Sequence, residues 1–167
     1  MSITSIAGKL FVPRQKELQH YQNGAEKMQD EVLKYLVNTA ASTEYGRNHL
    51  FKTIHSYDDF AKNVPLNTYE ELKGDIDRMR HGESDILWPG SVKWYAKSSG
   101  TTNDKSKFIP VSHDGLQRIH YQGGKDVVAL YLRNNPNSRL FDGRSLILGG
   151  SHSPNYNLPG SLVGDLS

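Results

Sequence analysis

Residues 97–110 constrain the fold of this chain more than any other stretch. They read Lys-Ser-Ser-Gly-Thr-Thr-Asn-Asp-Lys-Ser-Lys-Phe-Ile-Pro, and a short apolar stretch lies on each side. A turn rich in glycine and hydroxyl residues between two β-like stretches is typical of a strand, a turn and a second strand. Backbone N–H groups of such a turn can point at an anion, hydroxyls can donate to its oxygens, and lysine neutralises its charge. The stretch therefore predicts a phosphate-binding hairpin.

A nucleotide-binding loop of the form G-x-x-x-x-G-K-[ST] is the obvious competitor. Gly100 is followed by Lys105-Ser106, but the second glycine is missing and the spacing is one residue short. Such a loop must open a helix, whose N-terminus then helps to hold the phosphate. Here residues 107–111, Lys-Phe-Ile-Pro-Val, follow, and they are β-like. The hairpin is favoured over the strand-to-helix loop, and a polar surface hairpin without a ligand stays open as the alternative.

The residues before the hairpin are predicted to be mainly helical. Apolar residues at helical spacing predict a helix over 24–41, and a separate helix over 14–22 is interrupted near Asn23-Gly24. Capping-box patterns at Ser56 and Thr68 predict two further helices, the first stopping before Pro65 and the second ending near His81-Gly82. The second carries an apolar face of Leu72, Ile76 and Met79. Arg78 and Arg80 are interpreted as complements of its dipole.

The hairpin is followed by a longer helix and a further strand. Ser112 is expected to cap a helix that runs to about Arg133. Its buried stripe is predicted to consist of Leu116, Ile119, Val127 and Leu130. Gly123-Gly124 interrupts the pattern, which indicates either a close approach or kink, or a helix that breaks there. The apolar run within 144–150 is a candidate buried strand, and 92–96 is the strand that enters the hairpin.

Composition excludes several classes of function. The 20 basic and 18 acidic residues leave a net charge of +2, so no large field favours nucleic acid or a membrane surface. No apolar run is long enough to span a bilayer, and a cytoplasmic protein is the default expectation. The chain has no cysteine, and its seven histidines do not fall at metal-ligand spacing, so no protein-held metal site is predicted.

The hairpin stretch resembles the ATP-binding signature of the auxin-responsive Gretchen Hagen acyl-acid amido synthetases, within the adenylate-forming superfamily. The matching residues are Ser98-Ser99-Gly100-Thr101-Thr102, Lys107 and Ile109-Pro110. Residues 43–47 (Thr-Glu-Tyr-Gly-Arg) with Phe51 are similar to a segment that precedes this loop in the family. Residues 57–72, with Val64-Pro65, resemble its F…VP…Y…L stretch. Asp104 departs from the pattern, because the family often has glycine there.

The resemblance implies an α/β fold, the N-terminal portion of a large ATP-binding domain, with a helical first half followed by strands around the phosphate-binding hairpin. Residues 1–167 are expected to be that portion, with the rest of the domain and a C-terminal cap lying outside this chain. Lys107 and Thr101 are implied to be catalytic. The nucleotide is implied to be bound by Ser98, Ser99, Gly100, Thr101, Thr102, Lys105 and Lys107.

The resemblance also implies the reaction. A carboxylic acid attacks ATP in the presence of Mg²⁺ to give an acyl-adenylate, and an amine, usually of an amino acid, then forms an amide. This chain alone is expected to be inactive, because the family's later motifs are missing from it. Two alternatives remain: an acyl-CoA ligase of the same superfamily, and a noncatalytic helical interaction module.

Overall fold

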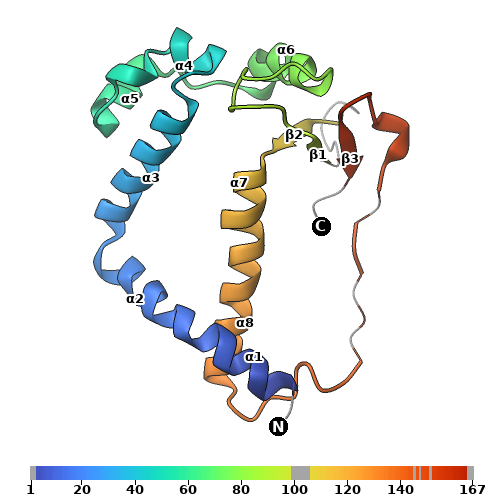
Figure 1. Cartoon of the computed structure of the whole chain (residues 1–167). Coiled ribbons are helices and arrows are strands. Elements are labelled where there is room, and N and C mark those ends of the chain that lie inside the picture. The colour runs from blue at the N-terminus through green and yellow to red at the C-terminus, as the bar shows by residue number, and fades with distance from the viewer. Residues whose placement is uncertain (1–2, 99–105, 145, 147, 151, 165–167) are drawn as a thin grey trace. The chain divides into compact units, whose positions relative to one another are not determined.

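The computed structural model describes residues 3–98, 106–144, 146, 148–150 and 152–164. These residues form two compact units, the first of residues 1–28 and 114–148 and the second of residues 29–113 and 149–167. Figure 1 labels the helices and strands along the chain. The elements are α1 (Ile3–Phe11), η1 (Val12–Arg14), α2 (Gln15–Asn23), α3 (Ala25–Ala40), α4 (Glu44–Asn48), η2 (Phe51–Thr53), α5 (Tyr57–Asn63), α6 (Tyr69–Arg80), β1 (Trp94–Lys97), β2 (Phe108–Val111), α7 (His113–Gly115), η3 (Leu116–Tyr121), α8 (Gln122–Asn134), η4 (Pro154–Tyr156) and β3 (Leu162–Gly164).

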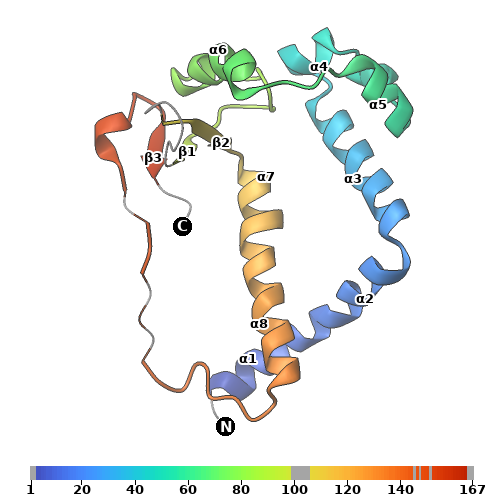
Figure 2. The same ribbon diagram turned by 180° about the vertical axis from the view of Figure 1, so that it is seen from behind.

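The first unit is held together where α1 lies beside the C-terminal part of α8, an arrangement that Figures 1 and 2 both show. Thr4 is buried, its backbone N–H donates to Asp142 Oδ1 over 3.2 Å, and its hydroxyl accepts from the Phe141 N–H over 2.9 Å. A second tie joins Arg14 Nε to Asp126 Oδ1 at 3.0 Å. This ion pair and its hydrogen bond raise the pKa of Arg14. Polar contacts thus fix both ends of α1–η1 against the α8 segment.

One hydrophobic cluster of the second unit lies where α3 ends and α4 begins. Its buried members are Val37, Ala40, Phe51 and Ile54. Leu33, Tyr45, Phe60, Val64 and Trp88 pack around them. The chain can turn sharply between α3 and α4 because Thr43 is fully buried and its hydroxyl both donates to Ala40 O and accepts from the Gly46 N–H, at 2.7 and 3.0 Å.

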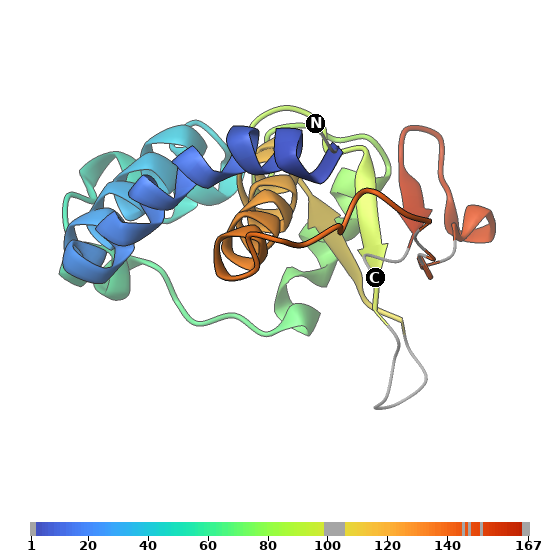
Figure 3. The same cartoon turned by 90° about the horizontal axis from the view of Figure 1, so that it is seen from below.

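A second cluster joins α6 to a small sheet. The strand order is β2-β1-β3, with β1 antiparallel to β2 and parallel to β3. In Figure 3 β1 and β2 lie side by side as the two arms of the predicted hairpin. The buried residues that join helix and sheet are Ile76, Met79, Ile86, Val92, Tyr95 and Val163. The α/β class, with helices first and the hairpin after them, is therefore confirmed.

Local signals in the sequence are confirmed where they cap helices. The side chains of Ser56 and Thr68 each accept from the backbone N–H three residues on, at 3.1 and 3.4 Å. The carboxylate of that third residue accepts in return from the backbone N–H of the capping residue. Hydrogen bonds from the His55 backbone N–H and from Ser56 lower the pKa of Asp59, and hydrogen bonds from Thr68 lower that of Glu71. The first of the two helices ends before Pro65 and the second at His81, with Gly82 at φ +95°. Capping patterns succeed because every partner lies within three residues.

Arg78 does more than complement the dipole of α6. Its guanidinium binds both carboxylate oxygens of Glu44, at 2.9 and 2.7 Å, and both of Glu83, at 2.9 and 2.6 Å. Asp75 lies 3.2 Å away. Hydrogen bonds from Arg78 lower the pKa values of Glu44 and Glu83 and raise its own. The side chain ties α4 to α6 and to the loop that follows.

Two predictions about the segment after the hairpin are wrong. The expected buried stripe is exposed at Ile119, Val127 and Leu130, whereas Ala129 and Leu132 are the buried residues of α8. Residues Leu116–Tyr121 form a π-helix. Its wider turns shift the phase of everything after it, so a 3.6-residue period does not carry across.

The apolar run within 144–150 also forms no strand among its described residues. Leu146 and Leu148 are both 89% exposed. A short apolar run forms a strand only where a neighbouring strand shares its hydrogen bonds, and the described part of this run pairs with none. Within the described residues, no helix has both the length and the apolar character needed to cross a bilayer.

Tyr95→Phe is expected to stabilise the second unit. Tyr95 is 2% exposed, and its hydroxyl finds no hydrogen-bond partner among the described residues. Removing a buried polar group without a partner should raise the free energy of unfolding by up to about 1 kcal/mol. Burial also raises the pKa of Tyr95 to about 12. The wild type should therefore lose stability above about pH 10, where an unfolded tyrosine ionises, until the folded pKa is reached.

Urea denaturation at neutral pH and at about pH 11 checks both expectations. The Phe variant should unfold at a higher urea concentration at neutral pH and should fall less in stability on the alkaline side. A variant less stable than the wild type at neutral pH would mean that the hydroxyl has a stabilising partner.

Candidate functional site

The predicted hairpin is closed by Ser98 and Lys107. β1 and β2 pair with Lys97 opposite Phe108, and one residue further the Ser98 N–H donates to Lys107 O over 2.9 Å. The Lys107 N–H points back at the Ser98 hydroxyl oxygen, 3.4 Å away. The residue after the turn thus continues into a strand and not into a helix, which confirms the hairpin over the strand-to-helix loop. Two of the predicted ligands stand opposite each other at its base.

The other predicted ligands lie outside the described residues. These are Ser99, Gly100, Thr101, Thr102 and Lys105, as well as the atypical Asp104. Their roles, including that of Thr101 in catalysis, stay predictions. The structure describes the residues at the base of the hairpin and those packed around it, which together form a platform at this end of the sheet.

That platform is rich in cations held over aromatic rings. Lys107 Nζ lies 5.4 Å from the centroid of the Tyr69 ring, and Lys97 Nζ lies 4.2 Å from that of Tyr156. Among the described residues neither ammonium pairs with a carboxylate. Aromatic faces attract cations without cancelling their charge. The base of the hairpin therefore keeps two positive charges that an anion can use.

Arg80 is a third cation in this region, and reading it as a dipole complement did not anticipate its contacts. Its guanidinium carbon lies 3.8 Å from the centroid of the Phe108 ring, and Nη2 donates to Tyr156 O over 3.0 Å. Its Nε is buried without a partner among the described atoms. Phe108 and Tyr156 also contact each other, with ring centroids 5.8 Å apart. Residues from α6, β2 and η4 thus meet at one end of the sheet.

Sequence reasoning missed Tyr69, Arg80 and Tyr156 as neighbours of the hairpin. Tyr69 is 38 positions before Lys107, and in the sequence it belongs to a capping pattern and to the stretch that resembles the family, neither of which points to Lys107. Its place at the first turn of a predicted helix does not indicate which strands that helix will cover. Nothing in the spacing of aromatic residues indicates which ring a lysine will contact.

Gly123-Gly124 lies in the first turn of α8, immediately after the π-helix. The helix does not break there but continues to Asn134. A Cβ built on either glycine meets no described atom within 4 Å, so the described residues provide no close approach. The irregularity lies just before the glycines, where the helix changes from π to α geometry. Such π turns are frequent at functional sites.

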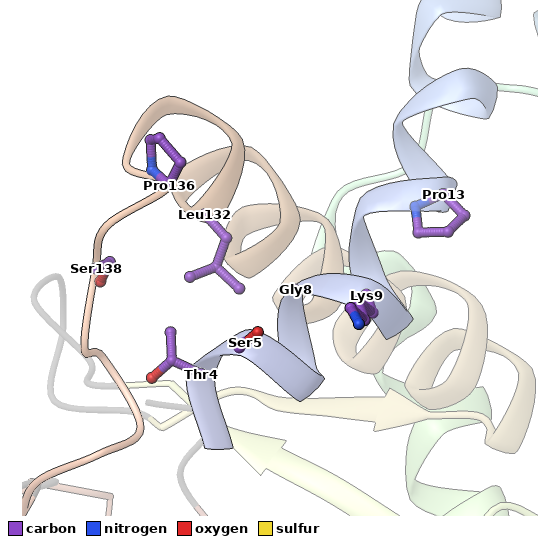
Figure 4. A pocket seen from close by; sticks show the side chains of 8 residues that line it. All are labelled: Thr4, Ser5, Gly8, Lys9, Pro13, Leu132, Pro136 and Ser138. Atoms are coloured by element: carbon purple, nitrogen blue, oxygen red, sulfur yellow. The ribbon is translucent and has the colours of Figure 1, made fainter. Parts of the chain in front are cut away.

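A cavity of about 430 Å³ lies in the first unit, and Figure 4 shows it between α1 and the end of α8. Its lining includes the Leu132 side chain, Thr4, Ser5, Pro13 and Lys9. None of the predicted nucleotide ligands lines it. With one lysine as its charged residue, it does not have the chemistry of a polyphosphate site.

Comparison with known proteins gives the family. A sequence profile described as "GH3 family N-terminal domain" matches residues 14–166. An indole-3-acetic acid-amido synthetase, GH3.15 of Arabidopsis thaliana, is 35% identical over 106 residues, which are 62% of this chain and 18% of that protein. A 4-substituted benzoates-glutamate ligase, GH3.12 of the same plant, is 29% identical over 110 residues, 64% of this chain and 19% of its own.

A solved structure described as "GH3.15 acyl acid amido synthetase" matches with a TM-score of 0.72 and 28% identity, covering 90% of this chain and 27% of that one. A second, in complex with 2,4-DB, matches with a TM-score of 0.64 at 27% identity, covering 83% of this chain and 24% of that one. The chain thus spans about a fifth of the length of the curated relatives it matches. Because the profile covers nearly all of its residues, this chain belongs to the GH3 family.

Proposed function

We propose that this chain is the N-terminal portion of the ATP-binding domain of an acyl-acid amido synthetase. The enzyme would activate a carboxylic acid with ATP to an acyl-adenylate and join the acyl group to the amine of an amino acid. Family membership and the names of the curated relatives, an amido synthetase and a glutamate ligase, support this reaction class. Small acids and amino acids are the partners that it requires.

The observation that carries the proposal is the pairing of Ser98 with Lys107 at the base of the hairpin. The pairing leaves residues 99–106 between two strand ends that are fixed by the β1–β2 ladder. Along the chain, the remaining signature residues lie between these two strand ends. Lys107, exposed and without a carboxylate partner among the described residues, keeps its charge for a ligand.

In this reaction an oxygen of the substrate carboxylate attacks the α-phosphorus of ATP, and pyrophosphate leaves with the electrons of the broken P–O bond. No covalent nucleophile from the protein is needed, so positioning and charge neutralisation dominate. Ser98, Ser99, Thr101 and Thr102 would donate to phosphate oxygens, and Gly100 would let the backbone approach closely. Lys107 would face the β- and γ-phosphates, with Lys105 as a helper.

Mg²⁺ enters this scheme with the nucleotide, as Mg-ATP. The described residues contain no group of three or more histidine or acidic side chains that could hold a metal. In nucleotide-binding sites Mg²⁺ is usually bound through substrate phosphates, waters and one or two carboxylates. The ion would add charge neutralisation on the phosphates, while the hairpin supplies the orientation.

The experiment that tests the proposal is acid-dependent ATP–pyrophosphate exchange by the full-length protein that carries this segment. Indole-3-acetic acid and 4-substituted benzoates are the first acids to try, and mass spectrometry of the product with glutamate follows. Exchange that needs the acid but not the amino acid, together with an amide product, is the expected result. A thioester formed with coenzyme A in place of the amide would favour the acyl-CoA ligase, and no acid-dependent exchange would contradict adenylation.

A further inference from the structure

Tyr69 contacts the hairpin through two different groups. Its hydroxyl accepts a hydrogen bond from the backbone N–H of Phe108 over 3.0 Å, and the ring lies beneath the ammonium of Lys107. Among the described residues β2 is an edge strand of the sheet, so an outward N–H on it has no described strand to pair with. Tyr69 accepts from that donor and, in the same geometry, places its ring beside Lys107, the residue directly before Phe108.

The position of this ring is set by its place on α6. Tyr69 is the first residue of α6, directly after the Thr68 capping box. The helix is anchored by Ile76 and Met79, which are 4% and 2% exposed in the core against the sheet. A lysine side chain, in contrast, is flexible and has many rotamers to lose. The contact therefore joins a rigid ring to a mobile cation.

We propose that Tyr69 is a positioning residue for Lys107, holding its ammonium at the base of the hairpin where the polyphosphate of ATP would bind. The proposal rests on the proposed function in one respect, the identity of the anion. A cation over an aromatic face keeps its charge while its freedom is restricted, so less entropy is lost when the phosphate arrives. Tyr69 would act through Lys107 and would not touch the nucleotide itself.

Two substitutions separate the ring from the hydroxyl. Tyr69→Phe keeps the ring and removes the acceptor for the Phe108 N–H, whereas Tyr69→Leu removes both. Tyr57→Leu is the matched control, because Tyr57 is likewise the first helical residue after a capping box and is 70% exposed. In the full-length protein Tyr69→Leu should raise the KM for Mg-ATP about two- to fivefold with kcat little changed. Tyr69→Phe and Tyr57→Leu should leave KM near the wild-type value.

A double variant tests the route of the effect. If Tyr69 works through Lys107, Tyr69→Leu should add nothing to the KM of a Lys107→Ala protein. Effects that simply add in the double variant would overturn the proposal, because Tyr69 would then act on the nucleotide by another path.

Lysine labelling reads the contact without any catalysis. Under limited reductive methylation of the full-length protein, Lys107 should react about twofold faster or more in Tyr69→Leu than in the wild type or Tyr69→Phe, with exposed Lys93 as internal reference. An unchanged methylation rate of Lys107 would overturn the positioning role even if ATP–pyrophosphate exchange is intact. If Lys107 is methylated faster in Tyr69→Leu as expected, but the protein shows no acid-dependent ATP–pyrophosphate exchange, the positioning role stands and the proposed function is contradicted.

Discussion

Gly46→Ala is expected to lower the free energy of unfolding by about 3 kcal/mol, a large fraction of the stability of a small domain. A Cβ at this position would lie 2.1 Å from Ala40 O and 2.9 Å from its carbonyl carbon. That carbonyl cannot move aside easily, because it already accepts from the Thr43 N–H at 3.0 Å and from the Thr43 hydroxyl at 2.7 Å. The clash is with backbone, so no side-chain rotamer relieves it.

Gly74→Ala is the matched control for this substitution. Gly74 is exposed inside α6 and a Cβ there meets nothing within 4 Å, so alanine should stabilise the helix by up to about 1 kcal/mol. Urea unfolding followed by tryptophan fluorescence measures both variants, since Trp88 packs against the cluster next to Gly46. A Gly46→Ala protein within about 1 kcal/mol of the wild type would show that the α3–α4 turn relaxes, and its tight geometry would then have no energetic weight.

The features that could be predicted from the sequence are those decided by residues close along the chain. Ser56 and Thr68 have their capping partners three positions away, and the interruption at Gly24 separates α2 from α3 as the local pattern indicates. The hairpin belongs to the same class, because the β-like residues on each side of its turn decide it before any distant contact forms. Gly46 is an intermediate case. It belongs to the 43–47 stretch that resembles the family, but the sequence does not show that the Ala40 carbonyl leaves no room for a side chain there.

The features that could not be predicted depend on partners far along the chain. Arg78 meets Glu44 across 34 positions, and no rule of spacing links them. The buried face of α8 is the one that carries Leu132, which lies 3.9 Å from where a Cβ of Gly8 would be. Periodicity predicted a single buried stripe and contained no information about which face α1 would cover. The π-helix added a phase shift that a straight helical period does not contain.

The candidate site shows the same division. Hydroxyls, a glycine and lysines within one turn indicate an anion site, and the family resemblance implies that the anion is ATP. The ring under Lys107 and the contacts of Arg80 come from α6. This helix meets the hairpin through the core around Tyr95 and through its contacts with β2. A sequence pattern names the groups that bind, whereas the groups that hold them in place come from the packing.

Lys107→Ala in the full-length protein is expected to slow acid-dependent pyrophosphate release about a hundredfold. This step expels pyrophosphate, a highly charged leaving group. Lys107 lies directly after the turn of the signature and has no carboxylate partner among the described residues. Lys107 would contact the phosphates when Mg-ATP binds and would also neutralise the negative charge that develops in the transition state, so the KM for Mg-ATP should rise and kcat should fall. Thr101→Ala should slow the same step for the same reason, through the loss of a hydroxyl donor.

Lys93→Ala is the control for that loss, because Lys93 is an exposed lysine directly before β1 and at the opposite end of that strand from Ser98. Its pyrophosphate release should stay near the wild-type rate. The rate should also return in part when Lys107 is replaced by arginine, which keeps the charge but not the shape of the ammonium. Equal rates for Lys107→Ala and Lys93→Ala would remove the hairpin from the mechanism and leave its lysines as surface charges, since a cation that faces the leaving pyrophosphate cannot be deleted without cost.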